Sequence, residues 1–385
     1  MKIGRSLQSP PVQSNLHSSF FSLPLVPLSS IIAGMARSDE ISTQLITLDP
    51  LLPDPAALLQ AGEILRRGGL VAFPTETVYG LGANALDEVA VRRIFAAKGR
   101  PAHDPVIVHI GAEEDLNRLT VNWPVVGEQL AAAFWPGPLT LVAARRALVP
   151  DAVTAGGPTV AIRRPRHPLA QAIIEAAGAP IAAPSANRFS HTSPTTAQHV
   201  KADLDGRIDL ILDGGPTPVG VESTVLDLTT DPPTLLRPGG VPVEEIEAII
   251  GPVQREPRRP AGEALPSPGL LDRHYAPRAV LWLFTGEAAA VHAALRSVAQ
   301  RLLLAGHRLG LLLADEDRDY LDDLQAERIY LGPLHDSAAV ARALFGAMRR
   351  LDEAGVEIIL ARDFPPGGLG DAVRDRLRRA ADQIM

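Results

Sequence analysis

Short apolar runs alternate with amphipathic stretches along the chain from about residue 46 onward. A short apolar run between Gly, Pro or polar residues is typical of a buried strand, whereas apolar residues spaced three and four positions apart predict a helix. The pattern predicts helices over 56–67, 88–98, 168–177 and 243–250, two helical patches before Trp135, and strands over 69–72, 105–110, 139–143, 159–162, 181–183, 210–212, 224–228 and 234–237. Because the strands are apolar throughout and interleave with helices, we expect an α/β domain over 46–250 with a largely buried mixed sheet.

The pattern continues in a second, smaller region over 279–385. Strands are predicted over 280–284, 309–313, 328–331 and 356–360, and helices over 288–304, 337–352 and 371–382. This alternation predicts a smaller C-terminal Rossmann-like α/β domain. The region lacks a G-x-G-x-x-G loop, so we do not expect a dinucleotide site there.

Two segments fall outside this pattern. Residues 1–40 are rich in Ser, Pro and Gln, and Pro24 and Pro27 interrupt their apolar part, which makes it a poor signal-peptide core. We expect a disordered extension, with Met35 as the true start of the protein. Residues 251–278 are dense in proline and predict a semi-rigid linker.

Composition narrows the functional classes. The chain has 385 residues, a net charge of −7 and no cysteine, and no apolar run long enough to span a bilayer. Disulfides, cysteine-ligated zinc and thiolate catalysis are excluded, and a cytoplasmic protein without membrane contact is expected. Lys2, Lys98 and Lys201 are the only lysines, so Lys98 is conspicuous in a chain that uses arginine almost everywhere else.

The stretch from Phe73 to Gly82 follows a buried strand and is the centre of the functional interpretation. Pro74 cannot donate to a sheet ladder, so we expect the strand to end there. The threonines, glutamate and glycines after it predict a polar loop, and open α/β sheets bind ligands at such strand ends. An ordinary strand-to-helix connection is the alternative interpretation.

Polar residues also follow other predicted strands. They include Lys98, Arg100, His109, Arg163, Ser185, Asn187, Ser223, Thr224 and Arg237. Cations at converging strand ends predict a site for an anionic small molecule. Structural alternatives stay open for these residues, because arginines are often solvated and Ser185 or Asn187 could cap a helix. No P-loop, nucleophile elbow or H-E-x-x-H pair is present.

Seven motifs in order resemble the threonylcarbamoyl-AMP synthase family, built on a YrdC-like domain. They are FPTETVYGLG (73–82), AKGRP with PVIVHI (97–101 and 105–110), WPGPLTLV (135–142), TVAIRRP (159–165), PIAAPSAN (180–187), DGG…GVESTVLDL (213–228) and LLRPG (235–239). The SPG…HYAP run in 267–277 and the C-terminal region resemble the two-domain form of the family. The resemblance implies a twisted, open mixed sheet in the N-terminal domain.

The resemblance implies a nucleotidyltransferase that makes L-threonylcarbamoyl-AMP and pyrophosphate from L-threonine, bicarbonate and ATP. The product would pass to a tRNA threonylcarbamoyl transferase, which modifies the adenosine beside the anticodon of tRNAs reading codons that begin with A. A weak contact with tRNA is a further expectation. Mg²⁺ would be held mainly by the ATP phosphates.

Carried over by position, the resemblance assigns individual roles. Lys98 and Arg100 would be catalytic by binding the ATP phosphates. ATP contacts would also come from Thr159, Ser185, Asn187, Ser193, Arg237 and Tyr275. The L-threonine contacts would come from Thr75, His109, Arg163 and Ser223. Residues 267–277, with His274 and Tyr275, are expected to form a lid over the site.

Departures and alternatives remain. Asp104 stands where the family often has asparagine, Leu271-Asp272 where relatives tend to be more basic, and Asp375 where asparagine is usual before Arg376. A carbamoyltransferase-type maturation factor is one alternative, but such proteins carry cysteine-rich zinc modules. An RNA-binding module is another, and the net charge of −7 disfavours it.

Overall fold

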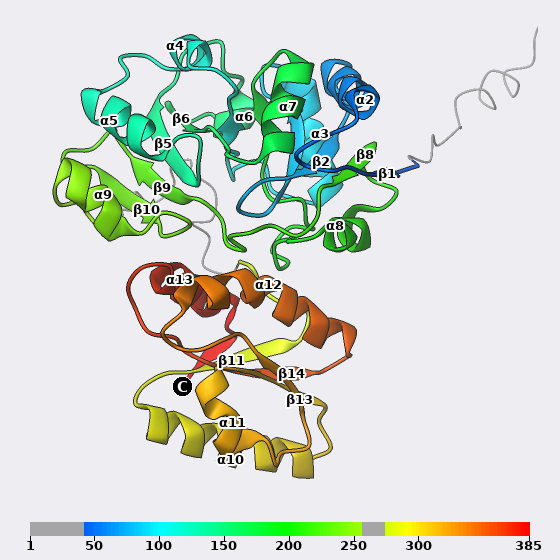
Figure 1. Ribbon diagram of the computed structural model, residues 1–385, viewed down its shortest axis with the longest axis vertical. Coiled ribbons are helices and arrows are strands. Elements are labelled where there is room, and N and C mark those ends of the chain that lie inside the picture. Colours follow the sequence, from blue (N-terminus) through cyan, green and yellow to red (C-terminus); the bar gives the residue numbers. More distant parts are fainter. Residues whose placement is uncertain (1–41, 256–273) are drawn as a thin grey trace, which may run out of the picture. The chain divides into compact units, whose positions relative to one another are not determined.

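The computed structural model describes residues 42–255 and 274–385 (Figure 1). The expected extension over 1–40, with Met35, lies outside the described residues, as does the part of the expected lid before residue 274. The described residues form a ten-stranded and a five-stranded sheet, which belong to one compact unit. No strand of either sheet lies between Arg237 and Val280 in the described part of the chain, and the exact domain limits stay a prediction.

The ten-stranded sheet mixes parallel and antiparallel neighbours, so the predicted α/β fold with a mixed sheet is confirmed. In spatial order its strands are β1 (Gln44–Thr47), β8 (Leu210–Asp213), β2 (Val71–Pro74), β3 (Tyr79–Asn84), β7 (Ile181–Ala182), β4 (Val108–His109), β6 (Thr159–Arg163), β5 (Leu139–Ala144), β9 (Thr224–Asp227) and β10 (Thr234–Arg237). Strands β4 and β6 are parallel, whereas β2 and β3 are antiparallel. The apolar pattern missed β1 because three of its four residues are exposed.

Local signals set the ends of the helices around this sheet. The helices are α2 (Pro55–Arg66), α3 (Glu88–Lys98), α4 (Glu114–Leu119), α5 (Val125–Phe134), α6 (Asp151–Thr154), α7 (Pro168–Ala177), α8 (Ala197–Leu204) and α9 (Val243–Ile250). The Asp87 carboxylate caps α3 by accepting from the backbone N–H of Val89 and of Ala90, and Gly99 ends the helix with φ 67°. No helix in the described ranges is long and apolar enough to cross a membrane.

Alternate residues of β2 enter two different cores, because successive side chains of a strand point to opposite faces. Ala72 packs into the cluster that contains Ile94 of α3, whereas Phe73 packs into the cluster that contains Ala61 of α2. Helices therefore cover both faces of the sheet around β2 and β3, which are the third and fourth of its ten strands (Figure 1).

Strand β2 ends at Pro74 as predicted, but the polar loop after it is the turn of a β-hairpin, because an unpredicted strand follows. Strand β3 begins at Tyr79 and pairs with β2, and the backbone N–H of Thr75 donates to the carbonyl of Val78 across the turn at 3.3 Å. Gly82 is required by packing, since a Cβ there would lie 2.7 Å from Cε1 of Phe73. Gly82 therefore makes room for the Phe73 ring within the hairpin.

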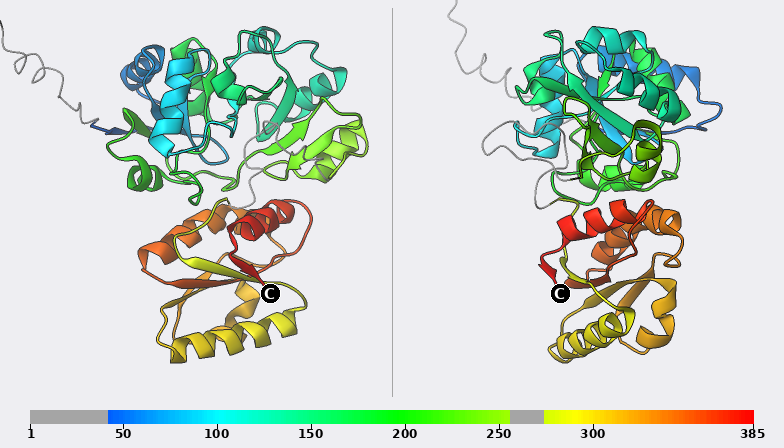
Figure 2. Two further views of the ribbon diagram at one scale, coloured as in Figure 1. Left: turned by 180° about the vertical axis from the view of Figure 1, so that it is seen from behind. Right: turned by 90° about the vertical axis from the view of Figure 1, so that its left-hand side faces the viewer.

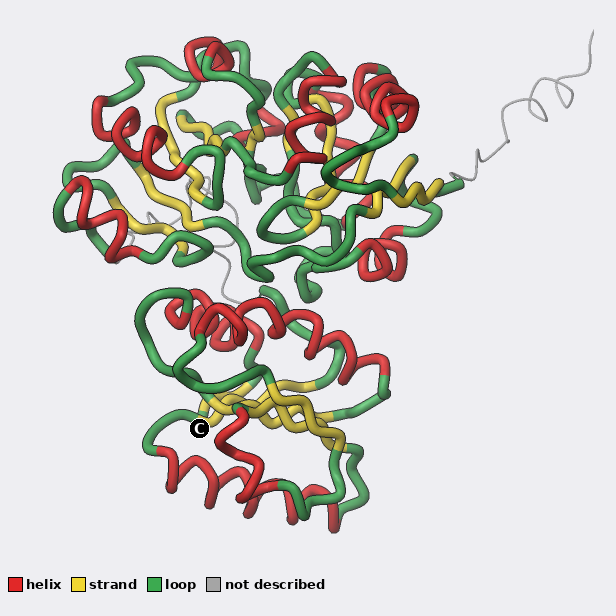
Figure 3. The backbone as a smooth tube through the Cα atoms, in the orientation of Figure 1, coloured by secondary structure: helices red, strands yellow, loops and turns green. Residues whose placement is uncertain are grey.

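The second sheet confirms the Rossmann-like prediction. Its strands are all parallel, in the order β13 (Glu327–Tyr330), β12 (Leu309–Leu313), β14 (Ile358–Arg362), β11 (Val280–Phe284) and β15 (Gln383–Ile384). Helices α12 (Ser337–Glu353) and α13 (Gly370–Ala380) cover one face, and α10 (Ala288–Leu304) and the short α11 (Arg318–Leu321) cover the other (Figures 2 and 3). This arrangement places α13 on the face that does not carry α10.

Candidate active site

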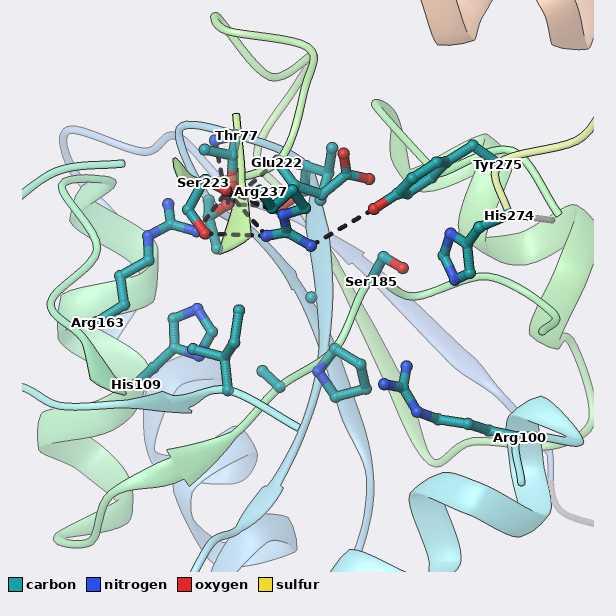
Figure 4. A pocket seen from close by; sticks show the side chains of 16 residues that line it. Thr77, Arg100, His109, Arg163, Ser185, Glu222, Ser223, Arg237, His274 and Tyr275 are labelled. Carbon is teal, nitrogen blue, oxygen red and sulfur yellow. Dashed lines mark hydrogen bonds between the residues drawn. The ribbon is translucent and has the colours of Figure 1, made fainter. Parts of the chain in front are cut away.

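Strand ends of the first sheet and the turn of the hairpin line a polar pocket (Figure 4). Its lining residues are Thr75, Thr77, Val78, Gly80, Arg100, Ile107, His109, Arg163, Ala183, Pro184, Ser185, Glu222, Ser223, Arg237, His274 and Tyr275. His109 and Arg163 are the last residues of the parallel strands β4 and β6, which explains why they meet. The pocket therefore brings together eight of the twelve residues to which the sequence assigns a binding role.

One end of the pocket is organised by Arg163. Its Nη1 donates to Oγ1 of Thr77 at 2.9 Å, and Oγ1 of Thr77 lies 2.8 Å from Oγ1 of Thr75. Its Nη2 lies 2.7 Å from Oε1 of Glu76, with the geometry of an ion pair rather than an aligned hydrogen bond. Burial favours the neutral acid, but the guanidinium outweighs it and the pKa of Glu76 lies below its usual value.

His109 sits beside Arg163 in the parallel pair of strands. It is 3% exposed, and burial together with the Arg163 charge lowers the pKa of the imidazole to about 3. The ring is therefore neutral near pH 7. A neutral imidazole can accept one hydrogen bond and donate another.

A second group of donors centres on Arg237 at the end of β10. Its Nε and Nη2 donate to the carbonyl of Ser223 at 3.2 and 2.9 Å. Its Nη1 lies 3.5 Å from the hydroxyl of Tyr275. Oγ of Ser223 is held at 2.8 Å from Oγ1 of Thr140, so the serine is fixed on both sides.

Arg100 and His274 lie on the side of the pocket away from Arg163, with Ser185 between (Figure 4). Nη2 of Arg100 lies 2.9 Å from Oδ2 of Asp104 and donates to the carbonyl of Pro105 at 2.6 Å. Burial raises the pKa of Asp104, although Arg100 opposes the shift. Asp104, which stands where the family often has asparagine, therefore fixes Arg100 and offsets part of its charge.

Lys98 does not line the pocket. Its Nζ donates to the carbonyls of Ser185 and Asn187 at 2.5 and 2.6 Å. Burial, with the nearby Arg100 charge, holds the pKa of Lys98 well below its usual value. Lys98 thus ties the end of α3 to the segment that carries Ser185.

Three further predicted contacts lie outside the lining. Nδ2 of Asn187 donates to the carbonyl of His191 at 2.7 Å, and Oγ of Ser193 donates to Oε1 of Glu222 at 2.5 Å. Both are directly behind pocket residues. Thr159 begins β6 and pairs with Ala144, so it lies at the opposite end of the strand from Arg163.

Among the polar lining residues, Thr77 belongs to the polar loop expected after Pro74 but was given no ligand, and Glu222 was not predicted. Glu222 is 6% exposed and precedes the Ser223 that was predicted, so its place in the GVESTVLDL run was the available signal. Among the described residues, no group of three or more His, Cys, Asp or Glu side chains is placed to hold a metal ion.

Known proteins place the chain in one family. Family models described as "Telomere recombination" and "Threonylcarbamoyl-AMP synthase, C-terminal domain" match residues 63–239 and 241–382. A relative named threonylcarbamoyl-AMP synthase from Pyrococcus abyssi is 47% identical, covering 83% of this chain and 93% of its own. One from Bacillus subtilis is 44% identical, covering 89% and 96%. A crystal structure of P. abyssi Sua5 complexed with L-threonine matches with TM-score 0.83 and 44% identity, covering 89% of this chain and 99% of its own. The chain belongs to the threonylcarbamoyl-AMP synthase family.

Proposed function

We propose that the chain condenses L-threonine, bicarbonate and ATP to L-threonylcarbamoyl-AMP and pyrophosphate. The observation that carries this proposal is the division of one pocket into two ends, each with its own arginine. Arg163 and neutral His109 form one end, and Arg100 forms the other (Figure 4). The carboxylate of threonine and the triphosphate of ATP are both negatively charged, so binding them in one cavity favours such separate cationic ends.

The Arg163 end suits L-threonine. A guanidinium can bind a carboxylate through two parallel hydrogen bonds, and the hydroxyls of Thr75 and Thr77 can orient the polar groups beside it. A P. abyssi relative was crystallised with L-threonine, which supports an amino-acid site in this fold. His109, with a pKa of about 3, is a poor base near pH 7, so its proposed role is to orient the substrate.

The end formed by Arg100, Ser185, Arg237 and Tyr275 suits ATP. Arg100 and Arg237 supply positive charge, the hydroxyl of Ser185 supplies a neutral hydrogen-bonding group, and Tyr275 lines the same end. Lys98 acts behind this wall by holding Ser185 in place. Losing one charge-assisted hydrogen bond to a phosphate would cost about 1.5–3 kcal/mol.

The chemistry then requires positioning rather than a protein nucleophile. The ammonium of threonine and bicarbonate give a carbamate, one water and one proton. A carbamate oxygen attacks the α-phosphorus, the bond from that phosphorus to the bridging oxygen breaks, and pyrophosphate leaves. The two ends of the pocket hold the reacting atoms together, and Arg100 and Arg237 stabilise the charge that develops on the phosphates.

The residues fit the expectation of Mg²⁺ carried by the nucleotide. The carboxylates that line or support the pocket, Glu76, Asp104 and Glu222, are each bound by an arginine. They are therefore unlike free metal ligands, and a Mg²⁺ bound by phosphates and water suits this site. The metal would neutralise phosphate charge during the reaction.

The proposed lid is supported by its described end. His274 and Tyr275 line the pocket, and the backbone N–H of Ala276 donates to the carbonyl of Ser190 at 2.9 Å. Tyr275 has φ 64°, a left-handed conformation that a bulky residue adopts only where its surroundings enforce it. A closed lid would exclude water from the mixed anhydride.

Transfer of the product to a tRNA threonylcarbamoyl transferase, contact with tRNA and a cytoplasmic location remain predictions. The function itself is tested with purified protein, labelled bicarbonate, L-threonine and ATP with Mg²⁺. Equal amounts of threonylcarbamoyl-AMP and pyrophosphate are expected, and neither should form when L-threonine is omitted. Pyrophosphate release without threonine, or no product with all substrates present, would refute the proposal.

A further inference from the structure

Arg376 of helix α13 reaches from the second sheet to the wall of the pocket. The side chain is 0% exposed. Its Nε donates to Oε2 of Glu222 at 2.8 Å, and its Nη1 donates to the carbonyl of Pro238 at 3.0 Å. Glu222 lines the pocket and Pro238 follows Arg237, so one guanidinium holds two segments of the wall.

The same guanidinium lies against the ring of Tyr275. Its Cζ is 4.9 Å from the ring centroid, a distance at which a cation and an aromatic face attract each other. The hydroxyl of Tyr275 lies 3.5 Å from Nη1 of Arg237. Arg376 therefore supports Tyr275, which lines the pocket from the described end of the expected lid.

Glu222, which binds Arg376, also binds a third segment of the chain, the one that carries Ser193. Its Oε1 accepts from Oγ of Ser193 at 2.5 Å while its Oε2 accepts from Arg376. The carboxylate is thus bound on both oxygens and cannot turn without breaking one of the two bonds. Arg376, Glu222 and Ser193 form a chain of contacts that ends behind the nucleotide end of the pocket.

Simple attachment of the second sheet does not explain this arrangement. A buried ion pair is weak evidence for stability, because desolvation offsets the attraction and apolar side chains can fill the same space equally well. Burial disfavours the charged guanidinium, but Tyr275, Glu222 and Asp375 outweigh that cost and the pKa of Arg376 is raised. A permanently charged group is therefore kept beside the pocket wall.

Arg349 provides an internal comparison. It lies on α12 of the same sheet and also reaches the first sheet's part of the chain, with Nη2 2.7 Å from Oδ2 of Asp203 and 2.5 Å from the carbonyl of Thr192. It is 9% exposed. Arg349, Asp203 and Thr192 do not line the pocket. Arg349 thus makes an equivalent attachment without touching the wall.

We propose that Arg376 is a positioning residue for the nucleotide end of the pocket, which is fully formed only when α13 is docked against Glu222 and Tyr275. This inference rests on the proposed function, because the nucleotide end is assigned there. It gives the second sheet a direct part in binding ATP. The threonine end, at Arg163 and His109, makes no contact with Arg376 in the hydrogen bonds, ion pairs and ring contacts of the described residues.

The test compares Arg376→Met with Arg349→Met in the full chain. Methionine keeps much of the apolar volume and removes the charge and the donors. Binding of a non-hydrolysable ATP analogue and of L-threonine is measured by calorimetry, beside the KM for each substrate. Arg376→Met should weaken analogue binding roughly tenfold to a hundredfold, as expected for lost charge-assisted bonds, and change threonine binding by less than about threefold. Arg349→Met should change neither.

Two results would overturn the inference. One is analogue binding by Arg376→Met that matches the unmodified chain. The other is equal losses in both variants, which would mean that attachment of the sheet is what matters. Arg376→Lys, which keeps the charge but reaches one partner at a time, should give an intermediate affinity and replaces the methionine variant if that variant does not melt cooperatively. The binding data remain informative even if the unmodified chain makes no threonylcarbamoyl-AMP, so failure of the proposed function is seen separately.

Discussion

Glu76 and Arg163 form a buried ion pair, with 2.7 Å between Oε1 and Nη2, beneath the turn of the β2–β3 hairpin. The second carboxylate oxygen accepts from the backbone N–H of Arg166 at 3.0 Å. Glu76 is 5% exposed and does not line the pocket, so its charge acts on Arg163 rather than on a ligand. The glutamate between two threonines, to which sequence analysis assigned no role, thus aims the arginine proposed to bind threonine.

Glu76→Gln should raise the KM for L-threonine about tenfold and leave kcat nearly unchanged. The amide keeps the shape of the side chain but loses the charge that fixes the guanidinium. Steady-state kinetics at saturating ATP measure both constants. Glu63→Gln, whose side chain is 59% exposed, is the matched control. A lower kcat at saturating threonine would show that Glu76 acts in the chemical step.

The buried neutral state of His109 predicts a pH dependence of stability. Its folded-state pKa is lowered to about 3, so below pH 6.5 the unfolded chain binds a proton that the folded chain does not. This contribution is present above pH 6.5 and is lost as the pH falls toward 3. His109→Gln should therefore lose about 2 kcal/mol less unfolding free energy than the unmodified chain between pH 7 and pH 5. Urea unfolding at both pH values measures the difference, and equal losses in the two proteins would contradict the assignment.

Lys98→Met should lower kcat/KM for ATP about tenfold to a hundredfold. The change removes the donor to the carbonyls of Ser185 and Asn187, and leaving a buried acceptor unpaired costs about 1–3 kcal/mol. The KM for threonine should stay within about twofold. Lys201→Met, on the exposed side of α8, is the control. An unchanged kcat/KM for ATP in Lys98→Met would show that Ser185 is positioned without the hydrogen bond from Lys98.

Tyr275 should act through its ring more than through its hydroxyl. The hydroxyl is 3.5 Å from Arg237, a long contact, whereas the ring stacks on Phe345 with centroids 5.8 Å apart and supports Arg376. Tyr275→Phe should therefore keep turnover within about threefold. Tyr275→Ala should lower turnover and shorten the lifetime of threonylcarbamoyl-AMP, followed by chromatography. Equal effects of the two changes would assign the role to the hydroxyl.

Apolar runs predicted most of the fold because buried strands and helices leave a local signal. Helix α7 and strand β10 were predicted with the bounds that the structure gives them. Exposed β1 carries no such signal, and the glycines of β3, of which Gly82 accommodates the Phe73 ring, concealed the strand at Tyr79. A local sequence pattern reveals burial and periodicity. Burial is nearly absent in β1, and glycines interrupt the apolar pattern of β3.

The site was predictable where a motif residue ends a strand, as with His109 and Arg163. A residue's place in the site was not predictable where it depends on which end of a strand the residue occupies, or on a contact between residues far apart in the sequence. Thr159 belongs to the same motif as Arg163 but lies at the other end of β6. Arg376 and Glu222 are 154 positions apart, so no local pattern relates them.

The central claim is that one pocket joins threonine, bicarbonate and ATP, and isotope exchange between ATP and pyrophosphate tests it most directly. The reverse reaction needs bound threonylcarbamoyl-AMP, so labelled pyrophosphate should enter ATP only when threonine and bicarbonate are both present. Arg163→Ala should abolish exchange at a threonine concentration that saturates the unmodified chain. Exchange that proceeds equally without threonine would contradict the account.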